Sequence, residues 1–171
     1  GSGLVGSEMC IRDSIIAAAG SGKTTHLIET ALQARNAIIL ITTFTEENEK
    51  EIRTRFFERN GCIPSNVVIQ TWFSFLLQHG VKPYQGYLYD KNIAGLVLVN
   101  GQSAFGSRET DIERHYLTGD KKIYSDKIAK FACRCDERSN GAVIFRLSKI
   151  YTHIFIDEVQ DLAGYDLEFL N

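Results

Sequence analysis

The segment from Ala17 to Thr24 has the residue types and the spacing of a phosphate-binding loop. It reads AAAGSGKT, and its two glycines allow consecutive backbone N–H groups to turn around phosphate oxygens. The lysine adds a positive charge for the outer phosphates, and the threonine hydroxyl is a ligand for Mg²⁺. An ordinary glycine-rich turn before a helix is the alternative interpretation. The residues that we expect to hold a nucleotide are Ala19, Gly20, Ser21, Gly22, Lys23, Thr24 and Thr25.

Two adjacent carboxylates would supply the second half of such a site. An apolar run, 154–156, leads directly into Asp157 and Glu158, and open α/β sheets bind ligands at the carboxyl ends of their strands. We expect Asp157 to hold Mg²⁺ opposite Thr24, and Glu158 to polarise an attacking water. Kinases transfer phosphate to an acceptor hydroxyl, so the adjacent glutamate favours hydrolysis. A strand that ends in two solvated acids is the alternative.

The apolar and charged segments alternate in a way that predicts the elements positioning these groups. Short β-branched runs predict strands at 14–18, 37–43, 67–70 and 152–156. Longer amphipathic segments predict helices at 23–34, 46–59, 71–78, 109–117, 124–133, 142–150 and 162–170. We expect Gly80 to end the helix at 71–78. The alternation of strand and helix predicts an α/β fold with a parallel sheet and helices on both of its faces.

Residues 80–149 interrupt this alternation and predict a small, mostly helical insertion. The segment 80–150 carries twelve basic and eight acidic residues, although the whole chain has a net charge of −2. We therefore expect one domain formed by 14–79 and 150–171, with the insertion between its two parts. Residues 1–13 resemble a cloning scar followed by translated vector sequence, and we expect them to be a non-native leader.

The length, composition and charge of the chain limit the kind of protein that it can be. The chain has 171 residues, of which 44% are hydrophobic and 23% are charged, so it is long enough to bury a core. The mild negative charge argues against binding nucleic acid by bulk positive charge. Neither a membrane span nor a signal peptide is expected. Four cysteines do not make a disulfide framework in a chain of this length, so we expect a cytoplasmic protein.

Four segments in register resemble the UvrD/Rep-like helicases of superfamily 1. AAAGSGKTT is similar to their motif I, TFTEENEKEIRTRF (43–56) to motif Ia, TWFSFLL (71–77) to motif Ib, and IDEVQD (156–161) to motif II. The resemblance implies a RecA-like P-loop NTPase fold, with 80–149 in the place of the family's 1B subdomain. It also implies Gln160 as a sensor of the γ-phosphate or its water. Glu46 and Glu47 depart from the family pattern, which usually has Asn and Lys there.

The resemblance further implies a track for single-stranded DNA. Aromatic rings stack on bases, and hydroxyl groups contact phosphate. The implied contact residues are Thr43, Phe44, Thr45, Thr71, Trp72 and Ser74. Core packing is the alternative for the aromatic members, and we assign Phe75 to the core.

The expected function is the ATP-binding and ATP-hydrolysing half of a DNA helicase or translocase, with ATP and Mg²⁺ as ligands. The family places a second RecA-like domain with an arginine finger after motif II. We expect these C-terminal helicase domains to be missing here and the fragment alone to be nearly inactive. The alternatives are a non-catalytic P-loop ATP-binding module and a small P-loop kinase. Glu158, Gln160 and the TFT segment argue against the kinase.

Overall fold

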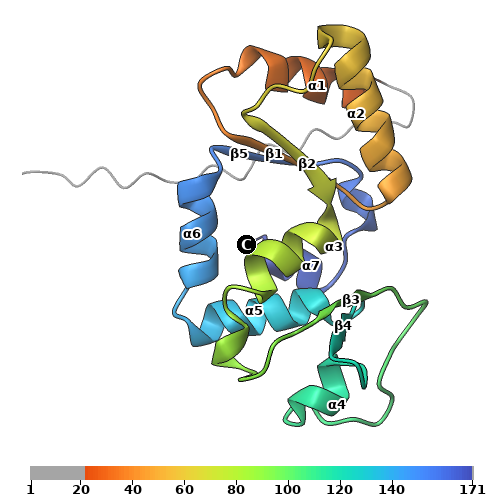
Figure 1. Ribbon diagram of the computed structural model, residues 1–171, viewed down its shortest axis with the longest axis vertical. Helices are drawn as coiled ribbons and strands as arrows, with labels where there is room; N and C mark the ends of the chain where they lie inside the picture. The colour runs from red at the N-terminus through yellow and green to blue at the C-terminus, as the bar shows by residue number, and fades with distance from the viewer. Residues whose placement is uncertain (1–21, 171) are drawn as a thin grey trace, which may run out of the picture.

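A three-stranded parallel sheet lies at the centre of the computed structural model, which describes residues 22–170 (Figure 1). The strands are β1 (Ile39–Thr43), β2 (Val67–Thr71) and β5 (His153–Ile156), in the order β2–β1–β5. The predicted α/β class and parallel sheet are therefore confirmed. The predicted strand at 14–18 lies outside the described residues.

Strand β1 occupies the middle of the sheet because its side chains are buried on both faces. All five of its residues are buried, which explains why the sequence of this strand shows no apolar–polar alternation. At its carboxyl end, Thr43 pairs with Thr71 of β2 and Thr42 pairs with Ile156 of β5. The segments that follow the three strands therefore start from one edge of the sheet.

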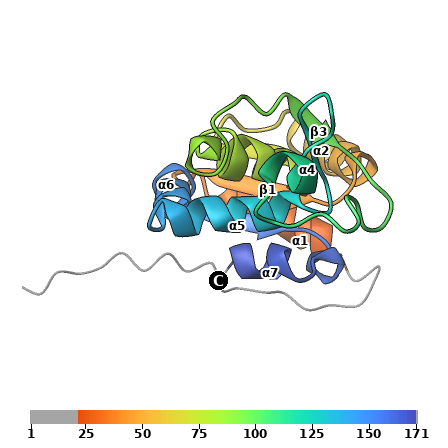
Figure 2. The same cartoon turned by 90° about the horizontal axis from the view of Figure 1, so that it is seen from below.

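Helices cover both faces of the sheet. Helices α1 (Lys23–Gln33) and α2 (Glu46–Asn60) pack on one face, where their apolar side chains meet the odd-numbered residues of β1 and β2. The other face carries a larger core, in which Leu40 of β1 meets α3 (Trp72–Phe75), α5 (Ile128–Arg138), α6 (Ala142–Ile150) and α7 (Tyr165–Phe169). Figure 2 shows α7 alongside α5.

The remaining elements are short. They are the π-helix η1 (Leu76–Val81), the 3₁₀ turns η2 (Gln85–Tyr87) and η3 (Val159–Asp161), strands β3 (Gly95–Val97) and β4 (Lys122–Tyr124), and helix α4 (Ile112–Tyr116). None of the helices between residues 22 and 170 has the length and apolarity that a membrane crossing requires.

Gly80 does not end the helix that begins after β2, contrary to the prediction. Helix α3 continues as η1, and Gly80 lies inside that π-helix. A Cβ added at Gly80 would lie 2.8 Å from the Cβ of Ala132. The glycine therefore allows η1 and α5 to approach each other closely, and its role is in packing.

The middle segment differs from its prediction in two respects. Its strands β3 and β4 form a two-stranded parallel sheet that the sequence did not predict. Because β4 takes up residues 122–124, α5 begins at Ile128 and not at 124. Helix α5 also packs on η1 and α7, so one hydrophobic core crosses the predicted domain boundaries. The division into a domain and an insertion stays a prediction.

Candidate functional site

The start of α1 brings Lys23 and Thr24 to the sheet. Gly22 precedes the helix with a φ of 81°, a left-handed conformation that glycine adopts without a Cβ penalty. The first turn of α1 has no acidic residue and no side-chain cap. Its N-terminal amides are therefore able to bind an anion. Ala19, Gly20 and Ser21 of the predicted loop lie outside the described residues.

Asp157 is fixed at the carboxyl end of β5. Its backbone N–H donates to the carbonyl of Thr42 at 2.8 Å, which extends the pairing of β5 with β1 by one residue. The side chain is thereby held at the edge of the sheet from which α2 and α3 also depart.

The structure brings Thr24 and Asp157 together from distant parts of the sequence. The Thr24 hydroxyl and the Lys23 ammonium both lie near enough to the Asp157 carboxylate to stabilise its negative charge. Burial raises the pKa of Asp157, and Lys23 and Thr24 only partly offset that effect. A half-buried carboxylate with a neighbouring hydroxyl is thus left with an incompletely compensated charge.

These two oxygen donors fit Mg²⁺. Magnesium prefers hard oxygen ligands and is commonly held by one or two protein groups, with phosphate oxygens and waters completing its shell. Among residues 22–170, no three His, Cys, Asp or Glu side chains are grouped to hold a metal ion. Thr24 and Asp157 therefore suit a metal that arrives with a nucleotide, rather than a cage made by protein groups.

Glu158 has a partner that the sequence did not reveal. Its backbone has a φ of 61°, in the left-handed region that is uncommon for residues other than glycine. Its carboxylate accepts a hydrogen bond of 2.6 Å from Nδ2 of Asn48, in the first turn of α2. Nothing in the spacing of the motifs marks Asn48. The one usable signal was its place three residues after Thr45, at the predicted start of α2.

The other residues predicted to bind the nucleotide have fewer contacts with this cluster. Gln160 is exposed in the 3₁₀ turn η3, and Thr25 is half-buried in the first turn of α1. Neither residue forms a hydrogen bond with the side chain of Asp157 or Glu158 in the described part of the chain. The role of Gln160 stays a prediction.

The residues predicted to contact DNA gather at the carboxyl edge of β1 and β2. Thr43 and Thr71 are register partners there, and the rings of Phe44 and Phe73 meet edge to face with centroids 5.0 Å apart. The Thr43 hydroxyl is buried and has no hydrogen-bond partner among the described residues.

Two of the threonines in this group act as helix caps. The Thr45 hydroxyl accepts the N–H of Asn48 at the start of α2, and the Thr71 hydroxyl accepts the N–H of Ser74 at the start of α3. These bonds satisfy amides that a helix leaves free at its N-terminus. Thr45 and Ser74 are exposed, whereas Thr71 is buried.

Trp72 lies in the core, which favours the packing alternative over the predicted contact with DNA. Only 1% of its surface is exposed. Its indole N–H donates to Oδ1 of Asp166 at 2.7 Å, and its ring packs against Phe75 and Phe169. No face of the ring is free for a base in this arrangement. Phe75 is buried as predicted.

No known protein-family model matches the chain, and no curated protein matches it either. The functional interpretation therefore depends on the residues and on their arrangement.

Proposed function

We propose that this chain binds Mg·ATP at the edge of its parallel sheet and forms the ATP-hydrolysing, RecA-like half of a helicase or translocase acting on single-stranded DNA. The observation that carries the nucleotide site is the proximity of Lys23 and Thr24 to the Asp157 carboxylate. It joins the segment with phosphate-loop spacing to the segment with paired carboxylates, as a P-loop NTPase requires.

Each residue of the site has a distinct task in this proposal. Lys23 and the first amides of α1 bind the outer phosphates of ATP. Thr24 and Asp157 hold Mg²⁺, which supplies positive charge against the phosphate oxygens when it is bound. Glu158 accepts a proton from the attacking water at its carboxylate.

The assignment to DNA rests on the resemblance and on the position of the motif Ia and Ib segments. Phe44 and Thr45 follow β1 at the same sheet edge as Asp157, so a strand bound there lies next to the nucleotide. A second RecA-like domain would complete the site by contributing positive charge on the far side of the phosphates.

Nucleotide binding tests the first half of the proposal. A fluorescent ATP analogue with Mg²⁺ should bind the chain, and Lys23→Ala should weaken binding by roughly tenfold or more, because it removes a charge-assisted contact. Lys50→Ala, on the exposed face of α2, is the matched control and should bind as the parent does. Equal binding by parent and Lys23→Ala would overturn the nucleotide site.

Hydrolysis and its response to DNA, measured in a chain that also carries the second RecA-like domain, test the second half. Glu158→Gln should keep nucleotide affinity and lose phosphate release. Single-stranded DNA should stimulate phosphate release, and Phe44→Ala should reduce this stimulation more than Phe57→Ala, which removes an exposed ring from α2. Nucleotide binding without any hydrolysis would favour the non-catalytic ATP-binding module. Hydrolysis that is insensitive to every nucleic acid would contradict the helicase assignment.

A further inference from the structure

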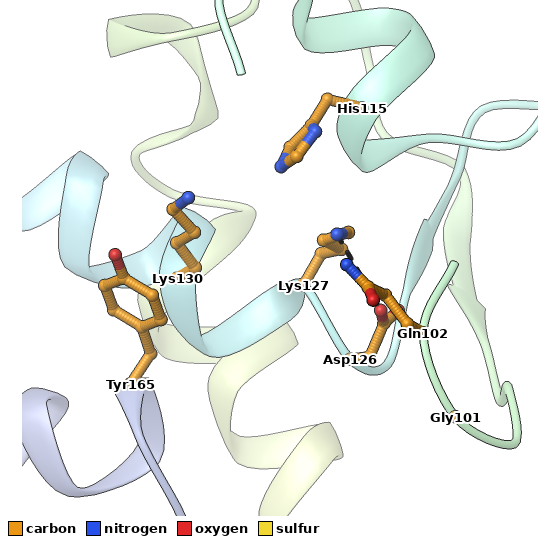
Figure 3. A pocket seen from close by; sticks show the side chains of 7 residues that line it. All are labelled: Gly101, Gln102, His115, Asp126, Lys127, Lys130 and Tyr165. Carbon is orange, nitrogen blue, oxygen red and sulfur yellow. Dashed lines mark ion pairs between the residues drawn. The ribbon is translucent and has the colours of Figure 1, made fainter. Parts of the chain in front are cut away.

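A second pocket lies beside the N-terminal end of α5, and none of its residues belongs to the candidate nucleotide site (Figure 3). Its volume is about 450 Å³, in the range of small-molecule sites. Four segments distant in the sequence contribute to it: the loop after β3, helix α4, the start of α5 and the start of α7. The lining residues are Gly101, Gln102, His115, Asp126, Lys127, Lys130 and Tyr165.

His115 presents an unpaired nitrogen to this pocket. Its Nε2 atom is buried and has no hydrogen-bond partner among residues 22–170. The other ring nitrogen, Nδ1, lies 2.9 Å from Oγ of Ser107, whose own hydrogen is donated to the carbonyl of Ala104 at 2.6 Å. Ser107 therefore accepts from Nδ1–H, which leaves Nε2 as a hydrogen-bond acceptor. Figure 3 shows the ring directed into the space between Lys127 and Lys130.

Lys127 is a buried cation with little compensation. Only 8% of its surface is exposed, and its ammonium lies 3.9 Å from the Asp126 carboxylate, beyond hydrogen-bond distance. That carboxylate already accepts the N–H and the hydroxyl of Ser103 at 2.9 and 2.6 Å. The positive charge of Lys127 is thus left without a close partner, so its position favours an anion in the pocket.

Further positive potential comes from Lys130 and from the helix itself. The Lys130 ammonium pairs with Glu109 at 2.6 Å and lies 5.3 Å from the centre of the Tyr165 ring. Helix α5 has 11 residues, and its first turn has neither an acidic residue nor a side-chain cap. The free amides at its start therefore add to the attraction for an anion.

We propose that this pocket binds a phosphate monoester, accepted by Lys127 and the start of α5 and oriented by His115. A monoester has a second pKa of about 6 and so retains an exchangeable proton near neutral pH. It can accept hydrogen bonds from the cations and donate one to Nε2 of His115. A phosphodiester of a nucleic-acid backbone has no such proton, so the unpaired acceptor favours the monoester. The phosphate group is the terminal group of a nucleotide, or it is inorganic phosphate, which is not an ester but also keeps an exchangeable proton near neutral pH.

The histidine resonances of the chain allow a direct test. The chain has four histidines, of which His115 alone lines the pocket. Titration should be done on a Lys23→Ala background, which weakens the candidate nucleotide site, so that failure of one site is distinguishable from failure of the other. Inorganic phosphate and AMP should each shift the ring signals of His115 in a saturable manner, and His153 should not respond.

A comparison of inorganic phosphate, AMP and a phosphodiester distinguishes the possible ligands of the pocket. Tighter binding of AMP would assign the ligand to a nucleotide, and equal affinity would assign it to the phosphate group alone. A dinucleoside monophosphate without a terminal phosphate should bind at least about tenfold more weakly. An unmoved His115 signal at millimolar phosphate and AMP, or equal binding of the diester, would overturn the proposal.

A charge-removing variant identifies the anion contact. Lys127→Met should weaken phosphate binding by about tenfold, whereas Lys82→Met, at an exposed position, should leave it unchanged. Unchanged binding in folded Lys127→Met would contradict the site. Because Lys127 is buried, its variant has to be checked by circular dichroism, and the comparison of monoester with diester decides the question if it does not fold.

Discussion

Asn48 of α2 donates a hydrogen bond of 2.6 Å to the Glu158 carboxylate. Glu158 is the residue proposed to accept the proton of the attacking water, and Asn48 lies three residues after Thr45, whose hydroxyl caps α2. The proposed DNA-contacting segment and the proposed hydrolytic residue are thus linked through the first turn of one helix. A movement of that turn would change how strongly the Glu158 carboxylate is held.

Asn48→Ala should raise ATP hydrolysis in the absence of DNA. The hydrogen bond from Asn48 competes with the attacking water for the Glu158 carboxylate, so its loss frees the base. We expect an increase of roughly threefold to tenfold, since one hydrogen bond to a charged group is removed. The measurement is phosphate release from Mg·ATP in a chain that also carries the second RecA-like domain. Asn60→Ala is the control because it removes a comparable amide donor at the other end of α2, where Asn60 binds the carbonyl of Cys62. An equal rate in Asn48→Ala and the parent would contradict this link.

Gly80→Ala should destabilise the fold through overpacking. The added Cβ would lie 2.8 Å from the Cβ of Ala132, so η1 and α5 would have to move apart at a cost of about 1–3 kcal/mol. Urea denaturation measures this cost. Gly86→Ala is the control, since a Cβ there meets no atom within 4 Å. If the two variants lose the same stability, the close approach of η1 and α5 is not what requires glycine at position 80.

The sheet and most helix positions were predictable because their signals are local. The run 37–43 is rich in β-branched residues and forms a strand over 39–43. Residues 142–150 have apolar side chains at helical spacing and form the predicted helix. Gly80 and residues 122–124 were misjudged for a different reason. The role of Gly80 is set by Ala132 of another helix, and β4 is stabilised by its pairing with β3. Such contacts between distant segments leave no periodicity in the sequence.

Some residues of the candidate site were likewise predictable from local sequence, and others were not. Motif spacing predicted that Lys23 and Thr24 would lie near Asp157. It predicted neither Asn48 nor the pocket beside α5, because their groups come together only in the folded chain. Trp72 is a different case, since a motif position suggested contact with DNA, whereas its ring is buried against α7.

Trp72 should report a buried environment in solution. The chain has one tryptophan, so its emission should be blue-shifted and poorly quenched by acrylamide in the folded protein. Single-stranded DNA should not quench it, because no face of the ring is accessible to a base. Strong quenching by DNA at saturation would restore the stacking role. Trp72→Phe should cost about 1–3 kcal/mol of stability, since it leaves Asp166 without the indole donor.

His79 should make the stability of the protein depend on pH between about 6.5 and 4. The ring is 4% exposed, its Nδ1 accepts from Arg146 at 3.3 Å, and its Nε2 faces the Tyr151 hydroxyl at 3.1 Å. Burial, with a further contribution from the Arg146 charge, lowers the pKa of His79 to about 4. In the unfolded chain the ring has its ordinary pKa of 6.5, so over this interval the unfolded state binds the proton and the folded state does not.

The stabilisation from neutral His79 is therefore complete above about pH 6.5 and is lost as the pH falls towards 4, by about 3 kcal/mol in total. His79→Gln cannot take up this proton, so its free energy of unfolding should fall less steeply over the same interval. His153→Gln is the control because His153 is exposed, and it should follow the parent. Denaturant titrations at half-unit steps of pH measure the three slopes. Parallel curves for the parent and His79→Gln would show that His79 is not held in its neutral form by the fold.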